Sequence, residues 1–264
     1  MFTLLRAGAL LTLGLGLNFQ ADPAQAAPAP PPPIEAQAKR LLQDMSDYLK
    51  AAKSFSFKAR IQFDDSQPDG QKILRSALAE ISLRRPNGLH VQQVGDMGTQ
   101  RLWFDGQQLA LLDPSRNSYA VEKLSGHTDK ALDYLSHTLH FTPPLADLLY
   151  LDVARALIRP DTRGALVGQS LVDGTPCTQL AFVTPQVDWQ IWIEAGRVPL
   201  LRQLVITYKN QPNAPQYRAT LSDWDFLTRL PDSLFRPEWP ANATQIPFPR
   251  ELERQPPTVN AQGH

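Results

Sequence analysis

Residues 187–208, V-D-W-Q-I-W-I-E-A-G-R-V-P-L-L-R-Q-L-V-I-T-Y, decide the fold class. Apolar and polar side chains alternate on both sides of Gly196, which predicts two antiparallel strands joined by a turn. On the first strand Trp189 and Ile191 share a face, and Trp192 falls on the other. We therefore expect Trp189 to be buried in the core and Trp192 to lie on an outer, wetter face.

The return strand of this hairpin is less clearly patterned. We place Leu204 and Ile206 on the inner face, which would put Arg202 near the rim of that face. An apolar inner face of this kind packs either against the protein's own core or against a bound guest, and the pattern does not choose between them.

The same alternation recurs through most of the chain. In S-F-S-F-K-A-R-I-Q-F (54–63), Phe55, Phe57 and Ile61 point one way and the polar residues point the other. Asp105-Gly106 predicts a type I′ hairpin turn, and Asp173-Gly174 is a second turn signal. Further strands are predicted at 74–84, 89–94, 99–104, 108–113, 118–122, 165–172, 177–183 and 216–227.

Three segments have helical rather than strand spacing. Residues 41–52 form one apolar stripe, and 128–158 divides into two pieces at Pro143-Pro144. We expect Thr142 to cap the second piece and Asp147 to lie on its exposed side. The second piece, 145–158, is apolar most of the way round, which predicts a helix sandwiched between layers.

Together these elements predict a mainly β fold with helices (α+β). We expect a curved, antiparallel, incomplete barrel of about 10–11 strands, with helices covering its concave face.

Composition and the chain ends suggest an exported protein. The 264 residues carry 26 Lys+Arg and 26 Asp+Glu, so no net field attracts nucleic acid or an anionic membrane. Arg6, the apolar run 7–19 and Ala24-Gln25-Ala26 have the pattern of a signal peptide (1–26) cleaved after Ala26; an uncleaved anchor is the alternative. We expect a proline-rich linker (27–33), a single half-barrel domain (34–248), a disordered tail (249–264), a periplasmic location and no membrane span after cleavage.

No catalytic or metal-binding motif is evident. Cys177 could be a nucleophile or a buried apolar residue, and its place inside a predicted strand favours burial. His137 and His140, with Asp133 one turn earlier, have the spacing of metal ligands, but nothing completes the site and solvated histidines are favoured. We expect no cofactor, no metal and no enzymatic activity.

Several stretches resemble a known family: F-D-G-Q-Q-L-A-L-L-D-P-S-R-N-S-Y-A (104–120), P-L-A-D-L-L (144–149), V-D-G-T-P-C-T-Q-L-A-F (172–182), V-D-W-Q-I-W-I (187–193) and P-Q-Y-R-A-T-L-S-D-W (215–224). They are similar to the predicted periplasmic proteins of domain-of-unknown-function family 2092. The resemblance implies a fold like that of the LolA/LolB-type lipoprotein carriers, and no established activity. Ser118-Tyr119 departs from the aromatic pair expected after Asn117.

By analogy of fold, we expect a periplasmic, non-enzymatic carrier or sensor of an apolar ligand such as a lipid or acyl chain. The alternative is an envelope scaffold with a filled core and a protein partner; an enzyme is the third class. The residues expected to line a ligand site are Phe55, Phe57, Ile61, Leu102, Phe104, Leu149, Val153, Trp189, Ile191, Leu204 and Ile206.

Overall fold

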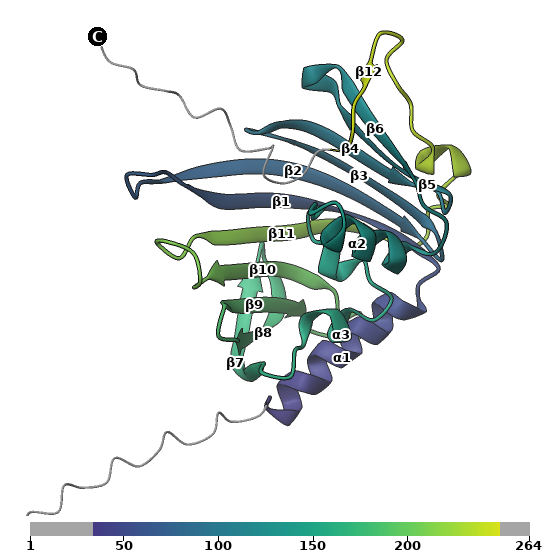
Figure 1. Cartoon of the computed structure of the whole chain (residues 1–264). Helices are drawn as coiled ribbons and strands as arrows, with labels where there is room; N and C mark the ends of the chain where they lie inside the picture. The colour runs from purple at the N-terminus through teal and green to yellow at the C-terminus, as the bar shows by residue number, and fades with distance from the viewer. Residues whose placement is uncertain (1–33, 249–264) are drawn as a thin grey trace, which may run out of the picture. The chain divides into compact units, whose positions relative to one another are not determined.

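One curved sheet dominates the protein, seen in a computed structural model that describes residues 34–248 (Figure 1). Within this range twelve strands follow the order β12-β6-β5-β4-β3-β2-β1-β11-β10-β9-β8-β7. The edge strands β12 and β7 do not pair, so the sheet stays open. The predicted signal peptide, linker and tail lie outside the described residues. The strands are β1 (Ser54–Ser66), β2 (Lys72–Arg84), β3 (Gly88–Gly95), β4 (Gly98–Phe104), β5 (Gln108–Asp113), β6 (Ser118–Lys123), β7 (Arg163–Val172), β8 (Thr175–Val183), β9 (Val187–Glu194), β10 (Leu201–Tyr208), β11 (Gln216–Asp225) and β12 (Thr244–Gln245).

The pairing confirms an antiparallel, incomplete barrel. Neighbours from β6 to β7 run antiparallel, and only the two-residue β12 runs parallel to its neighbour β6. At β1 the order of the strands in the sheet stops following the order of the sequence. On one side β1 pairs with β2, the next strand along the chain. On its other side β1 pairs with β11, from near the end of the described chain. Within the sheet, the run of strands β1–β6 is joined to the run β7–β11 by the pairing of β1 with β11.

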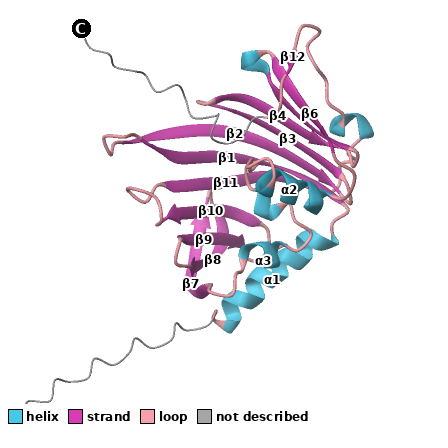
Figure 2. Ribbon diagram, viewed as in Figure 1, coloured by secondary structure: helices cyan, strands magenta, loops and turns pink. Residues whose placement is uncertain are grey.

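Helices cover one end of the concave face (Figure 2). They are α1 (Ala36–Ala51), α2 (Thr128–His137) and α3 (Val153–Leu157). Short 3₁₀ turns are η1 (Pro114–Arg116), η2 (Ala146–Leu148) and η3 (Asp232–Phe235). The predicted stripe of α1 is buried, with Leu42, Met45 and Leu49 in the main core. Ser46 on the same face accepts a hydrogen bond from the Ala154 amide (3.0 Å), which ties α1 to α3.

The long apolar helix predicted at 145–158 is wrong. Leu145 has a left-handed backbone (φ +58°), so a helix cannot run through it. The chain instead makes η2 and then α3, whose first turn is capped by Asp152 accepting from the Arg155 amide (3.0 Å). Thr142 caps no helix and is exposed. The apolar side chains of 145–158 are buried by two short turns rather than by one sandwiched helix.

The predicted position of Arg202 is also wrong. The register of β9 and β10 shifts between Leu201 and Gln203, a bulge that resets the alternation. Leu201 is therefore buried in the main core, as are Leu204 and its partner Ile191. Arg202 bonds to Glu194 (Nε to Oε2 2.8 Å), which lies on the outer face next to inward-facing Ile193.

The type I′ turn predicted at Asp105-Gly106 does not form. At Asp105-Gly106 only the glycine has a positive φ, and the Asp105 carboxylate accepts from the amides of Gln107 and Gln108. A type I′ turn needs positive φ at both central residues, so the prediction fails there. Asp173 (φ +46°) and Gly174 (φ +80°) both meet that condition.

The two tryptophans of the hairpin face opposite ways, as predicted. Trp189 belongs to the main core and stacks on Phe182, with ring centroids 3.9 Å apart. Trp192 lies on the outer face but is not wet, because it is only 9% exposed. It packs with Val172, Cys177 and Val205 in a small outer cluster. The expected face is right for Trp192 and the expected exposure is wrong.

Candidate functional site

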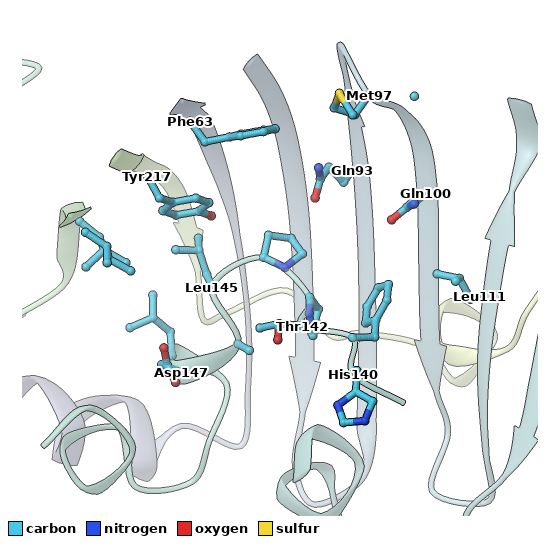
Figure 3. A pocket seen from close by; sticks show the side chains of 18 of the residues that line it. Phe63, Gln93, Met97, Gln100, Leu111, His140, Thr142, Leu145, Asp147 and Tyr217 are labelled. Atoms are coloured by element: carbon cyan, nitrogen blue, oxygen red, sulfur yellow. The ribbon is translucent and has the colours of Figure 1, made fainter. Parts of the chain in front are cut away.

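The concave face is packed at one end and hollow at the other. Where α1, α2 and α3 cover the sheet, side chains fill the space between them. Beyond the helices a cavity of about 1370 Å³ opens over the sheet (Figure 3). Its walls come from β1, β9, β10 and β11 on one side, from β3–β6 on the other, and from residues 140–148, which follow α2 and include η2. The apolar inner face is therefore packed against the protein's own core at one end and borders an open space at the other.

One wall of the cavity is apolar. Phe63, Tyr217 and Ile206 are cross-strand neighbours on β1, β11 and β10 and form a continuous row. Leu204 and Ile191, paired across β10 and β9, form the next row toward the helices. All five side chains line the cavity. Such rows of directly opposed residues present a continuous contact surface to anything bound against them.

The opposite wall becomes polar toward the open end. Gln93 and Gln100 pair across β3 and β4, and Asp113 and Ser118 pair across β5 and β6. All four line the cavity. Two residues nearer the helices, the same inner face carries the apolar pairs Val91–Leu102 and Leu111–Ala120. The cavity therefore has an apolar interior and hydrogen-bonding groups at its mouth.

The segment 138–148 passes over the concave face (Figure 3). Two of its residues, His140 (φ +50°) and Leu145 (φ +58°), hold left-handed backbone conformations that non-glycine residues rarely adopt. Phe141 and Leu148 turn into the main core and anchor the segment. Because those two anchors are buried, the exposed Asp147 between them is held at the cavity wall.

Asp147 and Tyr217 are electrostatically unusual. Asp147 is exposed by area, yet it lies within a concavity that protein largely surrounds, and this crowding governs its ionisation. Burial raises the pKa of Asp147, and the charge of Arg159 offsets part of that rise. Burial also raises the pKa of Tyr217, with further contributions from Tyr208 and Asp147. The Tyr217 hydroxyl is shielded from water and has no hydrogen-bond partner.

The other two carboxylates of the lining are compensated. Asp64 accepts from the Gln216 amide (3.0 Å) and pairs with Lys72 (3.1 Å). Burial alone would raise the pKa of Asp64, but these contacts outweigh it and hold the pKa below its ordinary value. Asp113 pairs with Arg116 (3.6 Å) and accepts from the Arg116 amide (3.1 Å). Both charges therefore already have partners within the protein.

The structure separates the predicted ligand-site residues into two groups. Ile191, Leu204 and Ile206 line the cavity. The other eight lie in the packed core and do not border the cavity: Phe55, Phe57, Ile61, Leu102, Phe104, Leu149, Val153 and Trp189. These residues were predicted from their apolar character alone. Apolar residues occur both in the packed part and in the hollow part of the inner face, so this criterion cannot separate the two.

The polar residues of the lining were not predicted, because only apolar residues were selected for the site. Gln93 follows Leu89 and Val91 at inward-facing positions of β3, and Ser118 precedes Ala120 at an inward-facing position of β6. A polar residue at an inward position of a strand was the available signal. Phe63, which follows Phe57 and Ile61 on the inner face of β1, lines the cavity as well.

The candidate chemical residues lie apart from the cavity or remain isolated. Cys177 is completely buried, as predicted, and burial raises the pKa of its thiol. His137 and His140 are exposed, and across residues 34–248 no three His, Cys, Asp or Glu side chains gather in a way that could hold a metal. Within the same range no helix has the length and apolar character needed to cross a membrane.

A family model covers most of the chain. The model of the family described as "Predicted periplasmic protein (DUF2092)" matches residues 38–249. No curated protein sequence matches the chain.

The solved structures that match the chain have low sequence identity to it. LprF from Mycobacterium bovis is 14% identical, with a TM-score of 0.45 over 76% of this chain and 98% of that one. An uncharacterized conserved protein from Thermus thermophilus is 9% identical, with a TM-score of 0.47 over 80% and 99%. A LolA superfamily protein from Nitrosomonas europaea is 16% identical, with a TM-score of 0.37 over 76% and 97%.

Proposed function

The chain belongs to the DUF2092 family of predicted periplasmic proteins, and we propose that it is a non-enzymatic carrier or sensor that holds a lipid or acyl chain in its concave cavity. The observation that carries the proposal is the hollow end of the sheet. A cavity of about 1370 Å³ exceeds the roughly 300–1,000 Å³ typical of sites for drug-sized ligands. Its apolar rows continue directly from the packed core. The cavity is therefore lined by apolar side chains like those of a protein interior, but protein side chains do not fill it.

The energetics of such a site need no catalytic group. Burying a methylene contributes about 0.8 kcal/mol, so ten methylenes would contribute about 8 kcal/mol before the cost of ordering the chain. The apolar row of Phe63, Tyr217 and Ile206 offers this contact along the wall. An alkyl chain can therefore be retained by desolvation alone.

The proposal is tested by displacement of an uncharged fluorescent apolar dye with hexadecanol, alongside native mass spectrometry of protein purified from its own cell envelope. Phe63→Asp places a charge on the apolar wall and should weaken hexadecanol binding at least about tenfold, because an ion in apolar surroundings is costly. Gln62→Asp is the matched control. It changes the adjacent residue on the opposite face of β1 and should leave binding within about twofold.

Two outcomes would count against a carrier. The first is a protein that repeatedly carries no lipid after gentle purification and from which hexadecanol displaces no dye. The second is equal loss of binding in Phe63→Asp and Gln62→Asp, because the dye would then report the outer surface. Crosslinks in intact cells to one partner protein, together with the first outcome, would favour the scaffold alternative.

A further inference from the structure

The cavity contains polar groups that the protein itself leaves without partners. In the part of the chain that the structure describes, the Tyr217 and Ser118 hydroxyls are two of the few buried side-chain atoms with no hydrogen bond. They lie on opposite walls of the same cavity, on β11 and β6. Ser118 is only 7% exposed. Since buried polar groups are nearly always paired, two such groups at one cavity point to contacts supplied by a guest.

The charges of the lining are also unbalanced in one place. Asp64 is paired with Lys72 and Asp113 with Arg116, so neither needs a cation from a ligand. Asp147 takes part in none of the ion pairs found between residues 34 and 248, and Arg159 acts on it only through longer-range attraction. The lining thus presents one uncompensated carboxylate.

Asp147 and the unpartnered Tyr217 hydroxyl lie near enough to influence each other. The charge of Asp147 contributes to the raised pKa of Tyr217, and both residues line the cavity, one on either side of Leu145 (Figure 3). A protonated amine is the group that fits both residues, because it carries a positive charge for the carboxylate and N–H donors for the phenol oxygen. An anionic head would be repelled by the carboxylate, and the lining cation, Arg116, is already engaged.

We propose that the cavity takes amine-bearing amphiphiles, with Asp147 and Tyr217 holding the ammonium group and the alkyl chain lying along the apolar wall. This inference rests on the proposed function, and it names the head group that a carrier of apolar chains would select. The same carboxylate weakens the binding of anionic amphiphiles of the same chain length.

The test compares three head groups on one chain: hexadecylamine, hexadecanol and hexadecyl phosphate, each below its micelle concentration at pH 7. Each displaces the uncharged dye from the full chain without its signal peptide. Hexadecylamine should bind about tenfold more tightly than hexadecanol, and hexadecyl phosphate should bind most weakly. Asp147→Asn should reduce the ratio of hexadecylamine affinity to hexadecanol affinity from about ten to about one.

Two further variants separate binding from damage to the fold. Tyr217→Phe keeps the ring and removes the hydroxyl, so it should weaken hexadecylamine several-fold with an unchanged melting temperature or a higher one. Asp161→Asn is the matched control for loss of a carboxylate, because Asp161 is exposed and does not line the cavity. It should alter no affinity.

The outcomes distinguish this inference from the proposed function. If none of the three probes displaces the dye, the carrier function itself fails. If hexadecanol binds but hexadecylamine binds no better, or if hexadecyl phosphate binds best, only the head-group inference is overturned. An amine preference that survives Asp147→Asn would overturn the role assigned to Asp147.

Discussion

Trp192→Ala tests whether the outer face of the sheet carries a second packed core. The side chain is 9% exposed and contacts Val172, Cys177 and Val205. A buried tryptophan removes about 150–250 Å² from water. At about 25 cal/mol per Å² this sets an upper bound of about 4–6 kcal/mol on its contribution. The cluster lies at the surface, where the site can relax or admit water, so we expect Trp192→Ala to lower the free energy of unfolding by about 2–3 kcal/mol.

The assay is a pair of urea melts against a control on the same strand and face. Gln190 points outward two residues before Trp192 and bonds to Gln179 (2.9 Å). Gln190→Ala should cost about 1 kcal/mol or less, since half-buried polar pairs exchange readily for water. If Trp192→Ala also cost less than about 1 kcal/mol, the outer cluster would be an ordinary wet surface and the reasoning would be refuted.

Two further predictions concern buried titratable groups. Cys177→Ser should destabilise the protein more than Cys177→Ala in urea melts, because it places a hydroxyl at a fully buried position where the thiol has only weak contacts, to the Thr175 carbonyl (3.4 Å) and the Val172 backbone; rapid labelling of the native thiol would contradict this burial. His90 stacks against Trp103, and burial, with the charge of Arg101, lowers the pKa of His90 to about 4. The unfolded chain then binds the proton more readily, so stability should fall as pH drops from about 6.5 toward 4. His90→Gln should flatten that part of the pH profile; an unchanged profile would show that other groups control it.

The strands were predictable because each carries its own alternation. Phe55, Phe57 and Ile61 lie on the inner face as the pattern indicates, and the resemblance to family 2092 is confirmed by the match over residues 38–249. The errors occur where a local conformation overrides periodicity. Leu145 adopts a left-handed backbone inside an apparently helical pattern, and a bulge after Leu201 resets the faces of β10.

The cavity was not predictable from hydrophobicity. Trp189 and Ile206 are cross-strand neighbours with the same pattern, yet only Ile206 borders the hollow space. Trp189 stacks on Phe182 in the packed core, and the alternation within one strand does not reveal such packing between strands. Gln93, a polar residue at an inward-facing position of β3, was the local indication that the inner face is not apolar along its whole length.

The pairing of β1 with β11 also sets the order in which the molecule can fold. β2 follows β1 directly, whereas β11 is synthesised after every other strand of the sheet except β12. Until β11 arrives, one side of β1 is a long strand edge with unpaired backbone groups, open to pairing with other chains. Closing contacts of such large sequence separation is slow. We therefore expect a nascent chain that lacks its last strands to be prone to aggregation and dependent on chaperones until the C-terminal segment is available.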